Sequence, residues 1–317
     1  MMKHVVIFVI VLFIFAVYIS PGQELDEANA PQQVKNLLQD MRKDIKDEGL
    51  SFTVGFNSAL NYSLDELCGL VEPRDWLQKA KEMSIAVKKP RVLRSMEAVG
   101  LPASWDWRDH NGVTAIRNQG GCGSCWAFGA IGSFESLLLI KDSISSDLSE
   151  QHLVSCNTWG WGCNGGWWPH DMLVNPGGVL EADFPYLASD VPCGGPYDFP
   201  FQLGGWAYVD GDNQVPSVDK IKEAIQTYGP VCAAVYVGTY FQSYTGGVFD
   251  KDESSGNGFC GCGQPSQVNH AIVLIGWDDS KQAWLLRNSW GSGWGESGYM
   301  WIKYGTSQVG YAAVIVY

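Results

Sequence analysis

The hydrophobic residues of the first hundred positions recur mainly at helical spacing. Val34, Leu37, Leu38, Met41 and Ile45 are separated by polar residues, which predicts a helix that ends at Gly49. The segment 63–66 reads Ser-Leu-Asp-Glu, the form of a capping box, and therefore predicts the start of a second helix. This part of the chain is expected to be a helical arm.

The remaining chain changes from helical to strand-like spacing. Helices are predicted over 124–140 and over 217–228, where Gly229-Pro230 ends the second one. Short β-prone runs separated by glycine-rich turns then follow at 231–237, 271–277, 283–287, 298–303 and 311–316. Helices followed by strands predict an α+β fold of two subdomains, with a cleft between them.

The N-terminus has the pattern of a secretion signal. Lys3 and His4 precede an apolar run over 5–19, and the small residues Ser20 and Gly22 follow it. We interpret 1–22 as a cleaved signal peptide, because a membrane-spanning helix needs about 20 apolar residues. An uncleaved membrane anchor is the alternative. Export would permit disulfides.

Composition separates an arm, 23–100, from a body, 101–317. The arm has a net charge of −2 and the body −12, and the body contains eight of the nine cysteines and 13 of the 14 tryptophans. A total net charge of −13 argues against a nucleic-acid partner. The stretch 79–94 holds six basic residues and one acid, so it can lie against the acidic body; a solvated linker is the alternative.

The chemistry concentrates around Cys125, where a glycine-rich turn meets the apolar helix over 124–140. The backbone N–H groups and the dipole at a helix N-terminus favour a thiolate, so we expect the pKa of Cys125 to be lowered. A nucleophile of this kind needs a base. His270 begins a buried strand, and Asn288 ends the next one, so the two side chains can meet. The other histidines are weaker candidates; His110 reads as a turn residue and His152 as a helix-surface residue.

These residues resemble the papain-like cysteine peptidases of the cathepsin type. The resemblance covers 101–317 and rests on several motifs in order: Gln119, Cys122-Gly123-Ser124-Cys125-Trp126, Cys163-Asn164-Gly165-Gly166, Asn269-His270-Ala271 and Asn288-Ser289-Trp290-Gly291. It implies a left helical subdomain and a right, antiparallel β-barrel-like subdomain, with the active-site cleft between them. It also implies that 23–100 is an inhibitory propeptide, removed near residue 100.

The resemblance assigns a role to each catalytic residue. Cys125 is the nucleophile, His270 the acid and base, and Asn288 the residue that orients His270. Trp290 shields their hydrogen bond, and Gln119 forms the oxyanion hole with the Cys125 backbone N–H. The expected reaction is peptide hydrolysis through a thiolate–imidazolium pair and a thioester, with no cofactor and no metal.

The substrate-binding positions follow from the same resemblance. Gly165 and Gly166 offer backbone to an extended peptide. An apolar P2 pocket is lined by Trp167, Trp168, Ala234, Asn269, Ala271 and Val314, which predicts a hydrophobic P2 residue. The stretch 157–162 is too short for the occluding loop that makes cathepsin B a dipeptidase, which favours an endopeptidase.

The cysteines match the family only in part. The family pattern implies the disulfides Cys122–Cys163 and Cys156–Cys193. The third disulfide of the family is excluded, because Val309 stands at the position of one of its two cysteines. Cys260 or Cys262 could instead pair with Cys232. The arm also departs from family propeptides, since Ala59 and Asn61 replace an aromatic residue and an acid.

Two other functions remain open at this stage. A thiol–disulfide protein could use Cys122 and Cys125, and a papain-fold binding protein could lack activity. We expect a monomeric zymogen in the secretory pathway, destined for the extracellular space or a lysosome or vacuole. Its partners would be protein or peptide substrates and its own propeptide, with no nucleic acid and no membrane once the signal is removed.

Overall fold

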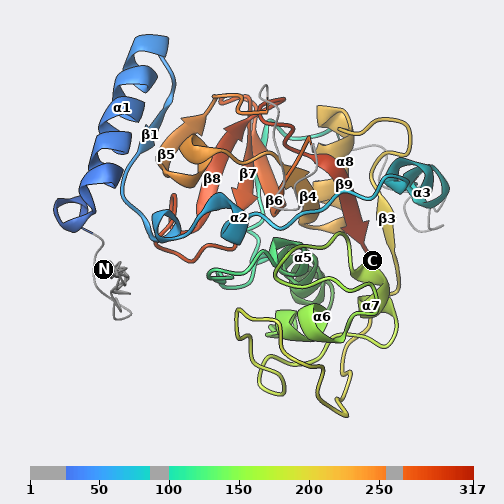
Figure 1. Ribbon diagram of the computed structural model, residues 1–317. Coiled ribbons are helices and arrows are strands. Elements are labelled where there is room, and N and C mark those ends of the chain that lie inside the picture. Colours follow the sequence, from blue (N-terminus) through green and yellow to red (C-terminus); the bar gives the residue numbers. More distant parts are fainter. Residues whose placement is uncertain (1–25, 86–99, 255–266) are drawn as a thin grey trace, which may run out of the picture.

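A computed structural model describes residues 26–85, 100–254 and 267–317, with one lobe built on a sheet and the other on helices and loops (Figure 1). The predicted signal peptide, 1–22, and the latter part of the basic stretch, 86–94, lie outside the described residues. No helix in the described part of the chain is long and apolar enough to cross a membrane.

The sheet lobe follows the strand order β1-β5-β8-β7-β6-β4-β9-β3, and β2 pairs with β6. The bounds are β1 Phe52–Val54, β2 Ser104–Asp106, β3 Trp206–Tyr208, β4 Val231–Val235, β5 Tyr244–Phe249, β6 His270–Asp278, β7 Ala283–Arg287, β8 Tyr299–Lys303 and β9 Tyr311–Val316. The pairing of β5 with β8 is parallel, and the other pairings are antiparallel. The α+β class is confirmed, although the described strands form an open mixed sheet rather than a closed barrel.

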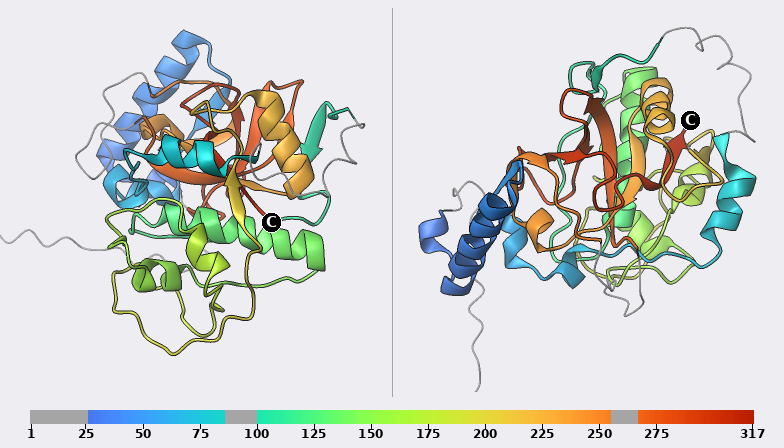
Figure 2. Two further views of the ribbon diagram at one scale, coloured as in Figure 1. Left: turned by 90° about the vertical axis from the view of Figure 1, so that its right-hand side faces the viewer. Right: turned by 90° about the horizontal axis from the view of Figure 1, so that it is seen from above.

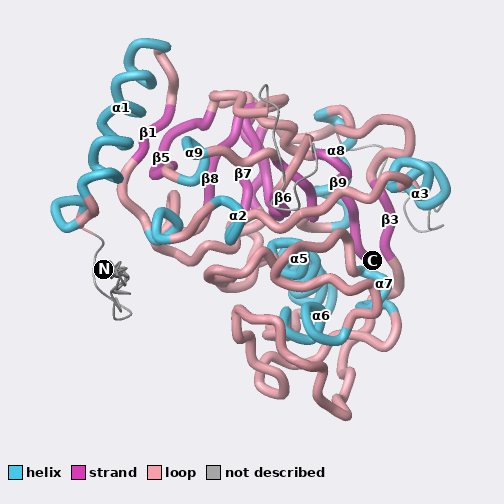
Figure 3. Tube along the Cα trace, viewed as in Figure 1, coloured by secondary structure: helices cyan, strands magenta, loops and turns pink. Residues whose placement is uncertain are grey.

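Helix α5, Cys125–Asp142, forms the boundary between the two lobes. Its buried residues are mostly apolar and lie on all sides of the helix, and it packs against β4 and β6. The helical lobe adds α6, Glu150–Cys156, and α7, His170–Val174, within long irregular loops (Figure 3). The sheet lobe carries α8, Val218–Tyr228, and α9, Thr239–Gln242.

The arm begins with η1, Glu27–Asn29, and α1, Gln32–Glu48, which ends at Gly49 as predicted. After β1, which adds to the edge of the body's sheet at β5, come η2, Ser58–Asn61, and α2, Leu64–Leu67. The predicted capping box of α2 is present between Ser63 and Glu66. The chain then bonds to Gly166 of the helical lobe and Asn269 of the sheet lobe, and it reaches α3, Trp76–Met83, on the opposite side of the body from α1 (Figure 2).

One expectation about α6 is wrong. His152 is buried rather than on the helix surface, because the rings of Tyr197 and Phe199 pack edge-on against its imidazole. Those rings come from a loop about forty residues later in the chain, so the local pattern around His152 contains no sign of them.

Candidate active site

Cys125 is the first residue of α5 and is fully buried. Cys122, three residues earlier, is bonded to Cys163, and a second disulfide joins Cys156 to Cys193. Cys125 is therefore a free thiol. This pairing removes the Cys122–Cys125 redox couple on which the thiol–disulfide alternative depends.

His270 begins β6, and Asn288 directly follows β7, the neighbouring antiparallel strand. Asn288 Oδ1 lies 2.8 Å from His270 Nε2 and also accepts the backbone N–H of Ser289. Because that backbone donor identifies the amide oxygen, His270 Nε2 must be the nitrogen that carries the proton. Nδ1 is thereby left as the proton acceptor of the neutral ring.

Trp290 covers this pair. Its ring centroid lies 4.8 Å from that of His270, and its side chain is buried. Phe241 and Trp294 pack edge-on against Trp290. The His270–Asn288 hydrogen bond is therefore held in an apolar surrounding, where it is stronger than it would be in water.

Gln119 presents its amide to the main chain of the arm. Gln119 Nε2 donates to the carbonyl oxygen of Leu67 at 2.9 Å and to that of Cys122 at the same distance. Ser289 Oγ donates to Gln119 Oε1 at 2.7 Å and so fixes which end of the amide faces the cleft. Ser289 was not among the residues predicted to form the site; its position between Asn288 and Trp290 was the available signal.

The arm lies in the cleft as an extended segment. Gly166 N donates to Gly69 O and Val71 N donates to Gly166 O, both at 2.9 Å, while Leu70 N donates to Asn269 O at 2.9 Å. Gly165 has φ +121°, and a Cβ there would lie 2.7 Å from Gly69 O. The predicted backbone positions thus contact a peptide segment, which belongs to this chain's own arm.

The predicted P2 positions gather into one apolar cluster. It contains Trp167, Trp168, Ala234, Ala271 and Val314, and Leu70 of the arm is buried within it. Asn269 differs, because its side chain bonds to both backbone groups of Val237 and so serves the loop rather than the pocket. Trp76 of α3 packs against Trp167 at the same cluster, with the two rings tilted.

The arm changes the electrostatics of the site. Burial raises the pKa of Cys125 to about 11, although backbone donors at Ala271 and Gly69 act to lower it. Burial likewise lowers the pKa of His270 to about 4, against the opposing effects of the Asn288 side chain and the Leu67 backbone. The expected lowering of the thiol pKa is therefore wrong for this arm-bound state, because desolvation outweighs the helix terminus.

The remaining cysteines are only partly described. Cys232 is a buried free thiol, so the suggested bridge to Cys260 or Cys262 is not formed; those two residues lie outside the described part of the chain. Val309 is buried. Within the described residues, no cluster of His, Cys, Asp or Glu could hold a metal ion.

Comparisons with known proteins agree on one family. The model described as papain family cysteine protease matches residues 101–317. A probable cysteine protease of Arabidopsis thaliana is 35% identical over 83% of this chain, and human cathepsin O is 35% identical over 70%. The chain spans 56% and 67% of the lengths of these two relatives.

Solved structures that include a precursor segment are similar over nearly the whole chain. The digestive procathepsin L2 proteinase from the larval midgut of Tenebrio molitor has a TM-score of 0.73 and 28% identity, covering 90% of each chain. The recombinant stem bromelain precursor has a TM-score of 0.67 and 27% identity, covering 89% of this chain and 88% of that one. The chain therefore belongs to the papain family of cysteine proteases.

Proposed function

We propose that this protein is the zymogen of a cysteine endopeptidase, in which residues 23–100 are the inhibitory propeptide. The observation that carries the proposal is the hydrogen bond from Gln119 Nε2 to the Leu67 carbonyl. A main-chain carbonyl that is bound by the predicted oxyanion-hole amide and that also acts on His270 has the surroundings that a scissile peptide carbonyl needs.

The mechanism follows from the positions of four side chains. Once the propeptide leaves, water reaches Cys125 and His270, and the desolvation that keeps both groups neutral is relieved. The thiol proton then passes to His270 Nδ1, and the Cys125 thiolate attacks the substrate carbonyl. Gln119 and the Cys125 backbone N–H stabilise the resulting oxyanion. His270 protonates the leaving amine, and water hydrolyses the thioester.

The substrate preference is inferred from the apolar cluster beside the cleft. Trp168 is fixed by a hydrogen bond from its Nε1 to Ala312 O at 3.1 Å, and Leu70 of the arm is buried in the same apolar cluster. We expect the mature enzyme to prefer a leucine-sized apolar side chain at P2. Its partners are then extended peptides or unfolded proteins, and it acts as a monomer in an extracellular or lysosome-like compartment.

The test starts from purified full-length protein. Incubation at about pH 4–5 with a reductant should release a new N-terminus near residue 100 and produce peptidase activity. Cys125→Ala should give neither the new N-terminus nor peptidase activity. An epoxide inhibitor of thiol proteases should label Cys125 alone, and a substrate with Leu at P2 should be cut much faster than one with Arg.

Two results would count against the proposal. A fully active enzyme that keeps its arm would exclude the propeptide role. An arm that is removed by an added protease without any peptidase activity would leave the papain-fold binding protein as the better explanation.

A further inference from the structure

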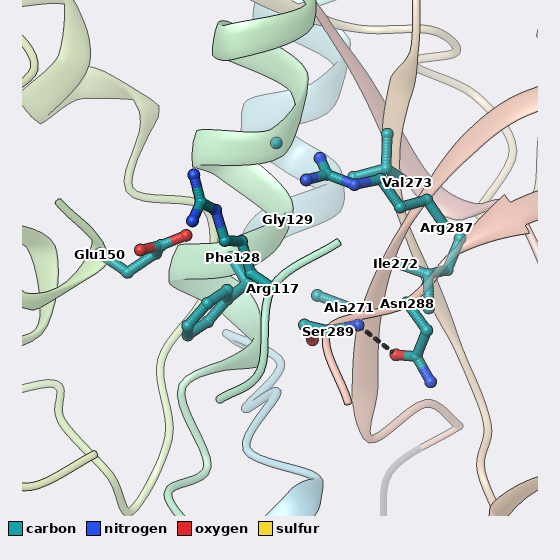
Figure 4. Close-up of a pocket in the computed structure, with 11 residues that line it drawn as sticks. Arg117, Phe128, Gly129, Glu150, Ala271, Ile272, Val273, Arg287, Asn288 and Ser289 are labelled. Atoms are coloured by element: carbon teal, nitrogen blue, oxygen red, sulfur yellow. Dashed lines mark hydrogen bonds between the residues drawn. The ribbon is translucent and has the colours of Figure 1, made fainter. Parts of the chain in front are cut away.

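A small cavity lies between the two lobes, next to the catalytic residues (Figure 4). Its volume is about 20 Å³, room for about one water molecule. Arg117 and Glu150 line it from the helical side, and Arg287 and Asn288 line it from the sheet. Buried charges are costly, so a cluster of them at this place needs an explanation.

Arg287 is the last residue of β7, directly before Asn288, and its side chain is buried. Its Nη2 donates to the carbonyl of Ala115 at 2.5 Å. A Cβ at Gly132 of α5 would lie 2.5 Å from Arg287 Nη1, so the guanidinium lies directly against the helix that begins with Cys125. Arg287, which directly precedes Asn288, is therefore fixed on α5 and on the segment that leads to Gln119.

The acidic partners of Arg287 are also fixed and buried. Glu135 of α5 accepts hydrogen bonds from Thr114 Oγ1 at 2.6 Å and Leu148 N at 2.9 Å. Burial raises the pKa of Glu135 and of Glu150, and the charge of Arg287 counteracts this for Glu135. Two further titratable groups act on Arg287, namely Arg117 and Tyr299. Arg117 itself pairs with Asp147 at 2.5 Å.

The guanidinium thus joins the two lobes at the level of the catalytic residues. It is attached to β7, it touches α5, and Glu135 and Glu150 attract it from the helical lobe. No direct ion pair between Arg287 and either glutamate occurs among the described residues. A water in the cavity could bridge the charges.

We infer that Arg287 is a positioning residue of the active site. By fixing the end of β7 on α5, it sets the place of the Asn288 amide, and through Asn288 it aligns the His270 ring with Cys125. This inference rests on the proposed peptidase function, since it concerns the alignment of the same catalytic groups.

The test compares Arg287→Met, which keeps the length of the side chain but not its charge, with Arg287→Lys. Each full-length zymogen is activated, and its active sites are counted with the epoxide inhibitor. For Arg287→Met we expect kcat per site to fall about ten- to hundred-fold, with KM changed less than about two-fold. The pH range in which iodoacetamide reacts rapidly with Cys125 should also narrow.

Arg287→Lys should restore most of the kcat per site and most of the pH range in which Cys125 is rapidly alkylated. Lys281→Met is the matched control, because Lys281 is an exposed cation at the other end of the same hairpin, and it should behave as the wild type. A purely structural role would lower the melting temperature of Arg287→Met but leave kcat per site and the alkylation profile unchanged, and this would overturn the inference.

If Arg287→Met does not fold, Gly132→Ala decides, since a Cβ at Gly132 would lie 2.5 Å from Arg287 Nη1 and would displace the guanidinium. An alkylation profile like that of the wild type would then reject the inference, and a narrowed one would support it. A wild-type protein without peptidase activity would count against the proposed function instead.

Discussion

Gly69 has the least space around it among the described glycines of the arm. A Cβ at this position would lie 1.7 Å from the carbonyl oxygen of Gly123, and that oxygen belongs to backbone that cannot turn away. Its neighbours Leu67 and Leu70 make the hydrogen bonds to Gln119 and Asn269. The contact of the arm with the catalytic residues therefore depends on a glycine.

Gly69→Ala should displace the arm from the cleft and impair latency. We expect activity to appear faster than in the wild type at a mildly acidic pH, measured as the rate of substrate cleavage after dilution of the zymogen. The mature enzyme should be unchanged, because it lacks residue 69. Lys79→Ala, an exposed substitution in α3, is the control. Wild-type latency in Gly69→Ala would show that this contact does not control activation.

At the scale of elements, the arm is held at three separate places. β1 pairs with β5, the segment after α2 lies in the cleft, and Trp76 of α3 docks on Trp167 and Tyr311. Beside β1, Tyr240 Oη donates to Asp44 at 2.8 Å, and Lys251 pairs with Glu48 at 2.7 Å. These two contacts tie α1 to the sheet lobe.

Phe52 tests the attachment at β1. Its ring is buried against Phe249, with centroids 4.7 Å apart. Phe52→Ala should weaken the docking of β1 by about 3–5 kcal/mol. In a Cys125→Ala background, hydrogen exchange of the β1 and β5 amides should become at least about a hundred-fold faster. Asp40→Ala, an exposed substitution in α1, should change the exchange rates little. Unchanged protection in Phe52→Ala would mean that β1 contributes nothing to retaining the arm.

The elements that could be predicted from sequence are those whose pattern is set locally. The apolar runs of β7 and β9 have the predicted bounds, and α5 and α8 differ by one or two residues at their ends. The short strands β1, β2 and β3 were not predicted, since three residues form a strand only when a distant partner is present. The same reason explains His152, which is buried by rings from a later loop.

At the scale of the whole molecule, the motif residues meet because both lobes contribute to one cleft. The sequence identified Cys125, His270, Asn288 and Gln119 as local motifs. The sequence could not predict that the arm would bury Cys125 and His270 and would reverse the expected pKa shift of Cys125. Desolvation depends on how the completed chain packs. Arg287 likewise gains its partners only when β7 meets α5.

Stability of the whole molecule should fall in acid, partly because of His170. This side chain is fully buried, stacks on Trp206 with centroids 5.3 Å apart, and has no hydrogen-bond partner for either ring nitrogen among the described residues. Burial lowers its pKa to about 3. The unfolded chain binds a proton at this residue below about pH 6.5, and the folded chain does so only near pH 3. Within that window, the free energy of unfolding therefore falls as the pH is lowered.

His170→Phe removes this proton uptake and keeps an aromatic ring against Trp206. Both proteins carry Cys125→Ala, which prevents self-cleavage. As the pH is lowered from 7 to 5, the free energy of unfolding of the variant should rise by about 2 kcal/mol relative to that of the wild type. Urea denaturation at the two pH values measures the difference. His110→Phe is the control, because His110 is an exposed turn residue whose ring also stacks on a tryptophan, Trp105. Parallel stability curves for His170→Phe and wild type would mean that the buried imidazole is protonated in the folded protein, or that the site opens to water before the chain unfolds.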